Sequence, residues 1–181
     1  DLHAHLLPDI DDGPDTVAES VAMARAAWDA GIHTMVCTPH MIEHFPTDPA
    51  RVHESVAQLQ AALEKEGVPL RILPGGEIAI SHLAALNDDQ LRMASYGGSG
   101  RWVLLEMPFH GWPIDLPEIL HSLEIRGYGA ILAHPERAEA VQRQPDRMRD
   151  AVGRGALVQL TAGSFVGDHG EAARRTAVML L

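Results

Sequence analysis

The feature that most constrains the fold of this 181-residue sequence is its alternation of short apolar runs with longer amphipathic stretches. Short apolar runs rich in β-branched residues are typical of buried strands, whereas apolar residues three and four positions apart indicate helices. Together with the opening segment we expect about six strands, the later ones over 33–40, 70–80, 102–107, 129–133 and 156–162. This alternation favours an α/β fold, either an open parallel sheet or a (β/α) barrel.

The helices are marked by capping residues as well as by apolar spacing. Thr16 and Glu19 have the spacing of a capping box, and Gly31 provides a stop for the first helix. Asp48 or Thr47 is the expected cap of the second helix. We expect helices over 17–28, 49–66, 116–126, 146–152 and 171–181. The strands are thus separated mainly by helices, as parallel pairing requires.

Composition and charge exclude several classes of protein. No run of about 18 uncharged apolar residues occurs, so we expect no membrane insertion. The formal net charge of −11 argues against a nucleic-acid partner, because phosphate backbones bind clusters of Lys and Arg. The single cysteine, Cys37, excludes an internal disulfide and fits a reducing cytoplasm, which is the expected location. No G-x-G-x-x-G motif follows the first strand, which argues against a Rossmann domain.

Imidazoles and carboxylates recur at one kind of position, the end of an apolar run. In a (β/α) barrel the carboxyl ends of the strands form one face, where the connecting loops build the site. Five strands would therefore each deliver an imidazole or a carboxylate to the same rim. The residues at these positions are His3, His5, His40, Glu77, Glu106 and His134.

These residue types favour metal binding over simpler structural roles. His3 and His5 are two positions apart and would share one face of a strand, although a pair of exposed strand residues is the simpler interpretation. A lone buried carboxylate costs several kcal/mol, and a bound cation would remove that cost for Glu77 and Glu106.

The aspartates of the opening turn have another explanation. Aspartate side chains hydrogen-bond to their own backbone in turns, and Gly13 permits a positive φ. We favour this turn chemistry for Asp9 and Asp11.

The donor set indicates which metals and which chemistry to expect. Histidine with aspartate and glutamate, without thiolates, suits Mn²⁺, Fe²⁺ or Zn²⁺, and multinuclear sites of this kind activate water for displacement at phosphorus. Arg137 offers a planar fork for a phosphate oxygen, although a solvated arginine at a helix start is the simpler interpretation. The other histidines lack the strand-end pattern, and only His44 and His110 stay open as rim residues.

Five segments of the sequence, taken in order, resemble one known superfamily. They are DLHAHLLPDIDDG, CTPHM, GGEI, LLEMPF and LAHPER. These segments are similar to those of the PHP superfamily (polymerase and histidinol phosphatase). Within it they most resemble the bacterial metal-dependent tyrosine phosphatases of capsular and exopolysaccharide gene clusters. The resemblance spans residues 1 to about 167.

The resemblance implies a fold, a metal centre and a substrate. The fold would be a single PHP domain over 1–181, a distorted, TIM-like (β/α)7 barrel. The centre would hold up to three ions, with Mn²⁺ preferred and Fe or Zn as alternatives. Arg137 would hold the phosphate while a metal-bound hydroxide attacks phosphorus. The expected substrate is a phosphotyrosine protein, in particular a tyrosine autokinase of polysaccharide export. The implied metal ligands are His3, His5, Asp12, His40, Glu77, Glu106 and His134.

One departure from the family pattern matters. The family ends its barrel with a strand carrying an Asp-x-His segment, whose two residues complete the metal shell. No Asp-x-His follows residue 134 here, because Asp168 and His169 are adjacent rather than alternating. We therefore expect that this chain lacks its last strand and binds metals more weakly than a longer version would.

Two alternative functions stay open at this point. One is a phosphoesterase for a small phosphate monoester such as histidinol phosphate or a nucleotide. The other is a degenerate, non-catalytic PHP domain, which the missing Asp-x-His segment favours. A cysteine-based phosphatase is excluded, because the sixth position after Cys37 is Glu43 rather than the arginine that would cradle phosphate.

Overall fold

The computed structural model describes residues 1–181 and has the α/β architecture expected from the sequence. The chain forms two compact units, Asp1–Val103 and Leu104–Leu181, and β5 (Trp102–Glu106) begins in one and ends in the other. Three strand pairs are parallel, as expected: β1 (Thr34–Cys37) with β3 (Arg71–Pro74), β2 (His40–Met41) with β4 (Glu77–Ala79), and β6 (Gly129–Ala133) with β7 (Leu157–Gln159). No helix of the chain combines the length and the apolar character that a membrane crossing needs.

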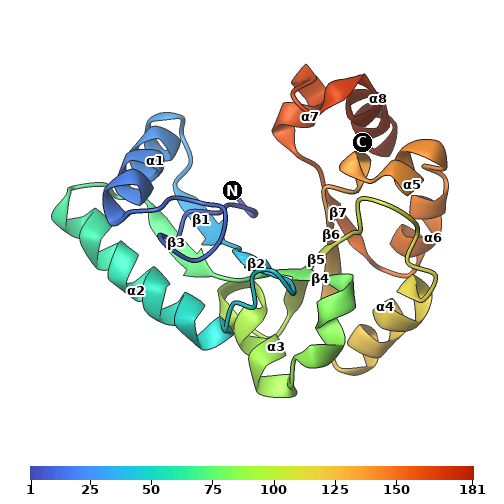
Figure 1. Cartoon of the computed structure of the whole chain (residues 1–181), viewed down its shortest axis with the longest axis horizontal. Coiled ribbons are helices and arrows are strands. Elements are labelled where there is room, and N and C mark those ends of the chain that lie inside the picture. Colours follow the sequence, from blue (N-terminus) through green and yellow to red (C-terminus); the bar gives the residue numbers. More distant parts are fainter. The chain divides into compact units, whose positions relative to one another are not determined.

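In the first unit, two long helices lie beside β1 and β3 (Figure 1). α1 (Val17–Asp29) begins with the expected capping box, in which Thr16 and Glu19 each accept the other's backbone N–H. α2 (Pro49–Lys65) begins after its cap, Asp48, and its buried face consists of Pro49, Val52, Val56, Leu59 and Leu63. The unit also contains η1 (Ile80–Ala85), α3 (Asp88–Ala94) and η2 (Tyr96–Gly98).

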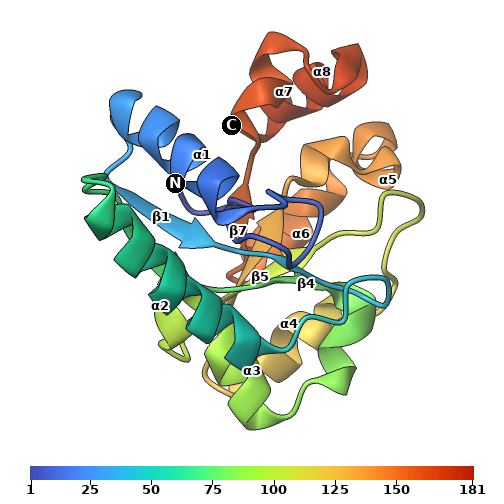
Figure 2. The same ribbon diagram turned by 60° about the vertical axis from the view of Figure 1, so that its left-hand side comes forward.

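In the second unit, helices pack on β6 and on one another. α4 (Leu116–Ile125) contacts β6 and α6 (Arg147–Gly153). The short η3 (Pro135–Arg137) and α5 (Glu139–Arg143) follow β6, and both contact α8 (Gly170–Leu180). α7 (Ala162–Val166) packs on α8, as Figure 2 shows. Fully buried side chains of this unit include Leu104, Leu105, Leu116, Leu132 and Val141.

Two segments that the sequence predicts as single strands are each broken in two. The 33–40 segment forms β1 and the start of β2, with Pro39 at the break, and the 70–80 segment forms β3 and β4, with Gly75 and Gly76 at the break. Proline has no N–H for a strand ladder, and glycine within a strand marks a close approach of chains. A Cβ on Gly75 would come within 2.9 Å of Val36 Cγ1, and one on Gly76 would overlap Met41. The pairing therefore stops after β1–β3 and resumes as β2–β4.

The opening segment is also less regular than expected. It forms one isolated parallel bridge, from Ala4 to Cys37, rather than a strand. Its backbone still follows β1, because the carbonyl oxygens of Asp1 and Ala4 accept the N–H groups of Val36 and Thr38. The turn that starts at residue 7 ends this pairing early. The short helices α3, α5 and α7 were not predicted, because five to seven residues carry little periodicity. The expected helix over 146–152 is α6, which is also seven residues long.

Candidate metal centre

Three imidazoles surround one buried carboxylate in the first unit. Glu77 opens β4 and is 0% exposed. Its Oε2 lies 3.2 Å from His3 Nε2, 3.3 Å from His5 Nε2 and 3.1 Å from His40 Nδ1. We call these four residues the Glu77 cluster.

Backbone pairing places each member of the Glu77 cluster. In the β2–β4 ladder, His40 stands directly opposite Glu77. The Ala4 N–H donates to Thr38 Oγ1 over 3.1 Å, which fixes the opening segment beside the end of β1. His3 and His5 flank Ala4 and turn to the same side, with their Nε2 atoms 3.3 Å apart. The spacing of two therefore has the consequence predicted for it, although the segment is not a regular strand.

Asp11 is built into the same cluster, which the sequence reasoning missed. Its side chain is fully buried, and its Oδ2 lies 2.6 Å from His5 Nδ1 and accepts the His40 N–H over 2.9 Å. Its Oδ1 accepts the Gly13 N–H, which is the turn chemistry expected for it. Asp11 thus closes the turn and orients two histidines at once. A carboxylate on the second nitrogen of a metal-binding imidazole is the usual outer partner of such a ligand.

The carboxylates shift the proton affinity of the cluster. Burial alone would lower the pKa of His5, but its hydrogen bonds to Asp11 and Glu77 outweigh this and raise the pKa to about 10. Burial would raise the pKa of Asp11, and the hydrogen bonds from His5, His40 and Gly13 together lower it instead. Without a metal, His5 is therefore a cation held between two anions at neutral pH.

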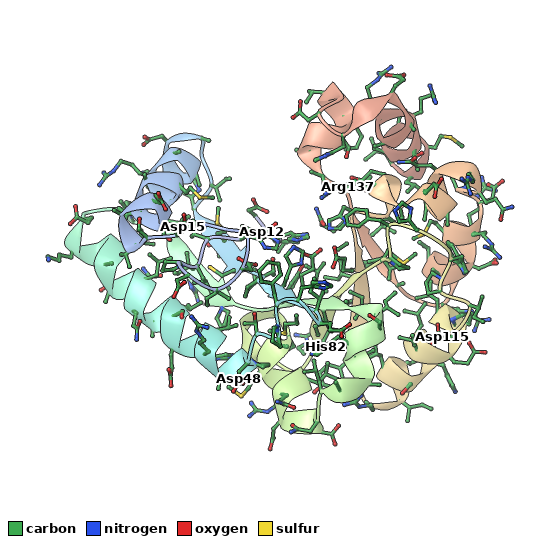
Figure 3. The ribbon with its side chains drawn as sticks, in the orientation of Figure 1. Asp12, Asp15, Asp48, His82, Asp115 and Arg137 are labelled. Atoms are coloured by element: carbon green, nitrogen blue, oxygen red, sulfur yellow. The ribbon has the colours of Figure 1, made fainter.

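Asp12 lies on the open side of the cluster, where Figure 3 labels it. Its Oδ1 is 3.5 Å from His5 Nδ1 and 3.7 Å from His40 Nε2, and its side chain is 65% exposed. Asp9 instead has a positive φ of 54° and an exposed side chain, which agrees with the turn role predicted for it.

The residues of the first unit fit a divalent cation. One ligand atom each from His5, His40 and Glu77 lie within 4.8 Å of one another, and the same holds for His5, Asp11 and Asp12. Imidazoles and carboxylates without thiolates suit Mn²⁺, Fe²⁺ or Zn²⁺. A carboxylate as deeply buried as that of Glu77 is costly unless a positive charge compensates it. A cation among these imidazoles would supply that charge.

The remaining predicted residues lie in the second unit. Glu106 ends β5 and is half-buried. His134 follows β6, is 5% exposed, and has a left-handed φ of 32°, which a backbone hydrogen bond from its N–H to Gln159 holds in place. Arg137 ends η3 and is half-buried; Figure 3 labels it.

Glu136 stands between His134 and Arg137 and was not singled out from the sequence. It is 0% exposed, and its Oε1 accepts the Thr161 N–H over 2.9 Å and the Ser164 hydroxyl over 2.7 Å. Its Oε2 is buried without a hydrogen-bond partner. Glu136 therefore ties the η3 turn to the segment between β7 and α7. The only sequence signal was an acid beside a buried run within LAHPER.

The histidines outside the strand-end pattern take no part in these groups. His53 Nε2 lies 2.9 Å from the Met93 carbonyl oxygen, and His44 is exposed. His110, which the sequence left open, has a 90% exposed side chain beside Glu139. Burial raises the pKa of the Cys37 thiol to about 12, which agrees with a core residue rather than a nucleophile.

Fold and cluster together define an α/β protein with a candidate centre for divalent cations. The family model for capsular polysaccharide synthesis, CpsB/CapC, matches residues 1–181, and the chain belongs to this family. This confirms the resemblance to capsular tyrosine phosphatases that the sequence motifs indicate.

Three relatives each cover at least 90% of the chain. It is 35% identical over 182 residues to tyrosine-protein phosphatase YwqE of Bacillus subtilis, spanning 100% of the chain and 71% of the relative. It is 28% identical to the putative tyrosine-protein phosphatase CapC of Staphylococcus aureus, with the same two coverages. It is 26% identical to tyrosine-protein phosphatase CpsB of Streptococcus pneumoniae, covering 90% of the chain and 67% of the relative.

A solved structure is also similar. It comes from a study of YwqE from Bacillus subtilis and CpsB from Streptococcus pneumoniae, which are described as metal-dependent tyrosine phosphatases. The match has a TM-score of 0.89 and 34% sequence identity, and covers 99% of this chain and 74% of the other.

Proposed function

We propose that this chain is a metal-dependent protein-tyrosine phosphatase, which hydrolyses phosphotyrosine on a protein. The observation that carries the proposal is the Glu77 cluster, three imidazoles around one fully buried carboxylate. It occurs in a chain of the CpsB/CapC family that is 35% identical to a tyrosine-protein phosphatase. The cluster fits a divalent cation. The similarity to tyrosine-protein phosphatases indicates phosphotyrosine hydrolysis, a reaction that such a cation would assist.

The metal ligands are proposed residue by residue. In the first unit, the contacts and burial described above support His3, His5, Asp12, His40 and Glu77. In the second unit, Glu106 and His134 are proposed from the family resemblance and from their places after β5 and β6. The proposed ions are Mn²⁺, or alternatively Fe or Zn, up to three in number. The fold proposed for the chain is the distorted (β/α)7 barrel, which its parallel strand pairs support.

The residues of the chain would have separate roles in the reaction, namely orientation of the metal ligands and binding of the phosphate. Bound divalent ions act as Lewis acids and make water acidic enough to act as a nucleophile near neutral pH. Asp11 holds the ring of His5 and the backbone of His40, so that the ligand atoms stay oriented. Arg137 would bind the phosphate oxygens with its planar fork and stabilise the charge that grows on them. A general acid is hardly needed, because the phenol of tyrosine has a pKa of about 10.

The proposed substrate is a phosphotyrosine protein in the cytoplasm, in particular a tyrosine autokinase of polysaccharide export. The membership of a capsular polysaccharide synthesis family supports this assignment. A small phosphate monoester remains the competing substrate, since phosphate and metal chemistry would be the same for both.

The test compares two substrates and one variant. With Mn²⁺ added, the protein should hydrolyse a phosphotyrosine peptide with a kcat/KM at least about tenfold above that for histidinol phosphate, which corresponds to 1.4 kcal/mol. Arg137→Ala should lower kcat/KM by about 10²-fold while bound metal is retained. Preference for histidinol phosphate would favour the small-molecule reaction. If neither substrate nor an activated aryl phosphate is hydrolysed, even by a version extended beyond Leu181, the chain is not a phosphatase.

A further inference from the structure

An exposed aromatic ring stands next to the proposed phosphate-binding arginine. Phe109 lies in the loop between β5 and α4 and is 43% exposed. The carbon at the centre of the Arg137 guanidinium lies 5.3 Å from the centroid of the Phe109 ring. The ring also stacks on the imidazole of His134, with planes inclined by 4° and centroids 6.1 Å apart. One ring thus lies beside two residues of the proposed site, the phosphate-binding Arg137 and the proposed metal ligand His134.

Contacts with α5 fix the backbone of this loop. The carbonyl oxygen of Phe109 accepts the Glu139 N–H over 2.9 Å, which joins the loop to the start of α5. His110, the next residue, lies with its Nδ1 3.3 Å from Glu139 Oε2. The backbone at Phe109 is therefore tied to α5, while the ring is partly exposed and lies beside Arg137 and His134.

An exposed ring at this position has a chemical use. In an aryl phosphate the aromatic ring begins one oxygen atom away from phosphorus. A phosphate bound by Arg137 would therefore bring the substrate's ring close to the surface that Phe109 lines. Aromatic rings attract each other in offset or edge-to-face arrangements with centroids 4.5–7 Å apart. An alkyl phosphate has no ring to make this contact.

We propose that Phe109 is a specificity-determining residue that recognises the aromatic ring of phosphotyrosine. The inference rests on the proposed function and adds to it the residue that separates aryl from alkyl phosphates. A competing role is to support the guanidinium of Arg137 by a cation–π contact. That role predicts equal effects on both kinds of phosphate, because the phosphate group is common to them.

The test uses the Mn²⁺-loaded protein and the variants Phe109→Leu and Phe109→Trp. Ile114→Ser is the matched control, because Ile114 lies in the same loop and is 88% exposed. Binding is measured as the inhibition constants of benzylphosphonate and n-propylphosphonate, which cannot be hydrolysed, so leaving-group chemistry plays no part. The methylene group of benzylphosphonate replaces the bridging oxygen and keeps the ring one atom away from phosphorus. The KM and kcat for a phosphotyrosine peptide and the bound metal are measured in parallel.

Phe109→Leu should weaken benzylphosphonate binding and raise the peptide KM by about threefold to tenfold. The inhibition constant of n-propylphosphonate, kcat and metal content should change by less than about twofold, which is below 0.5 kcal/mol. Phe109→Trp should retain aryl binding, and Ile114→Ser should match the wild type. Equal weakening of both phosphonates, or no change in either, overturns the inference. If the wild type hydrolyses no phosphotyrosine, the proposed function fails, and the phosphonate measurements still decide the role of Phe109.

Discussion

Each unit of the molecule buries one glutamate completely, and the two sites differ in what surrounds the carboxylate. Glu77 in the first unit has nitrogen atoms of three imidazoles within 3.3 Å of one oxygen. Glu136 in the second unit accepts hydrogen bonds from one backbone N–H and one hydroxyl, and its other oxygen has no partner. The two carboxylates are therefore equally buried. The imidazoles around Glu77 can release their protons and bind a metal, whereas the backbone N–H and the hydroxyl beside Glu136 cannot.

The difference separates a ligand from a structural tie. Imidazoles are good metal ligands when neutral, so a carboxylate among three of them is arranged for a cation. Neutral donors such as the Thr161 N–H and the Ser164 hydroxyl stabilise an anion where it stands and fix the two segments that they join. Substitutions at the two glutamates should accordingly act on different properties of the protein.

The largest effect is expected from Glu77→Gln. The amide keeps the shape of the side chain but removes its charge and one strong metal ligand. Loss of a residue that only contacts a metal ligand costs up to about 10²-fold in activity, so loss of a direct ligand should lower phosphotyrosine turnover by more than that. Steady-state kinetics with Mn²⁺ measure this loss, and circular dichroism should show an unchanged fold. Wild-type turnover in Glu77→Gln would remove Glu77 from the proposed ligand set.

Glu136→Ala should act on stability instead. It leaves the buried Ser164 hydroxyl and the partly buried Thr161 N–H without their acceptor, which should lower the free energy of unfolding by about 3 kcal/mol. Urea unfolding of the metal-free protein measures the change. Glu136→Gln is the matched control, since its amide oxygen can accept both hydrogen bonds, and it should stay within about 1 kcal/mol of the wild type. Equal losses in both variants would show that the charge, rather than the acceptor, is what matters.

Asp11→Asn should weaken metal binding without removing it. The change deprives His5 of the carboxylate on its Nδ1, so the affinity for Mn²⁺ should fall by about tenfold to hundredfold. Metal titration followed by calorimetry gives the affinity, and Asp9→Asn in the same turn serves as the control. An unchanged affinity in Asp11→Asn would reduce Asp11 to the turn residue that the sequence alone suggests.

The smallest effect, at most about tenfold for a change of one pH unit, is the dependence of metal affinity on pH. In the metal-free protein the pKa of His5 is about 10, so between pH 6.5 and 8.5 this imidazole is protonated and must lose its proton to bind a metal. Lower pH therefore weakens binding, and the affinity for Mn²⁺ should rise by up to about tenfold for each pH unit in this range. Titrations in buffers of different ionisation enthalpy would also reveal the released proton. An affinity that stays constant over this range would mean that His5 binds no metal.

Sequence reasoning found the Glu77 cluster because simple rules fix its members. A spacing of two turns His3 and His5 to one side, and His40 and Glu77 end or follow apolar runs that pair in parallel. The sequence of the turn does not indicate which of its aspartate side chains is buried. Asp11 is fully buried and Asp12 is exposed, although the two are neighbours with identical side chains.

Glu136 was missed for a different reason. Its partners, Thr161 and Ser164, lie 25 and 28 residues further along the chain, and no local pattern marks such a contact. The strand breaks at Pro39 and at Gly75 were missed because an apolar run shows where a strand can form but not where its partner changes. Local rules therefore predicted the longer elements and the side chains that gather around Glu77, whereas long-range packing decided which strands and side chains pair.

The function proposed for this protein requires that the surroundings of Glu77 form a divalent-metal site. Calorimetric titration with Mn²⁺ of the wild type, Glu77→Gln and Glu136→Gln tests it directly. We expect the wild type and Glu136→Gln to bind Mn²⁺ with the same affinity, and Glu77→Gln to bind fewer ions or none. Absence of Mn²⁺ binding by the wild type, or equal binding by Glu77→Gln, would contradict the claim.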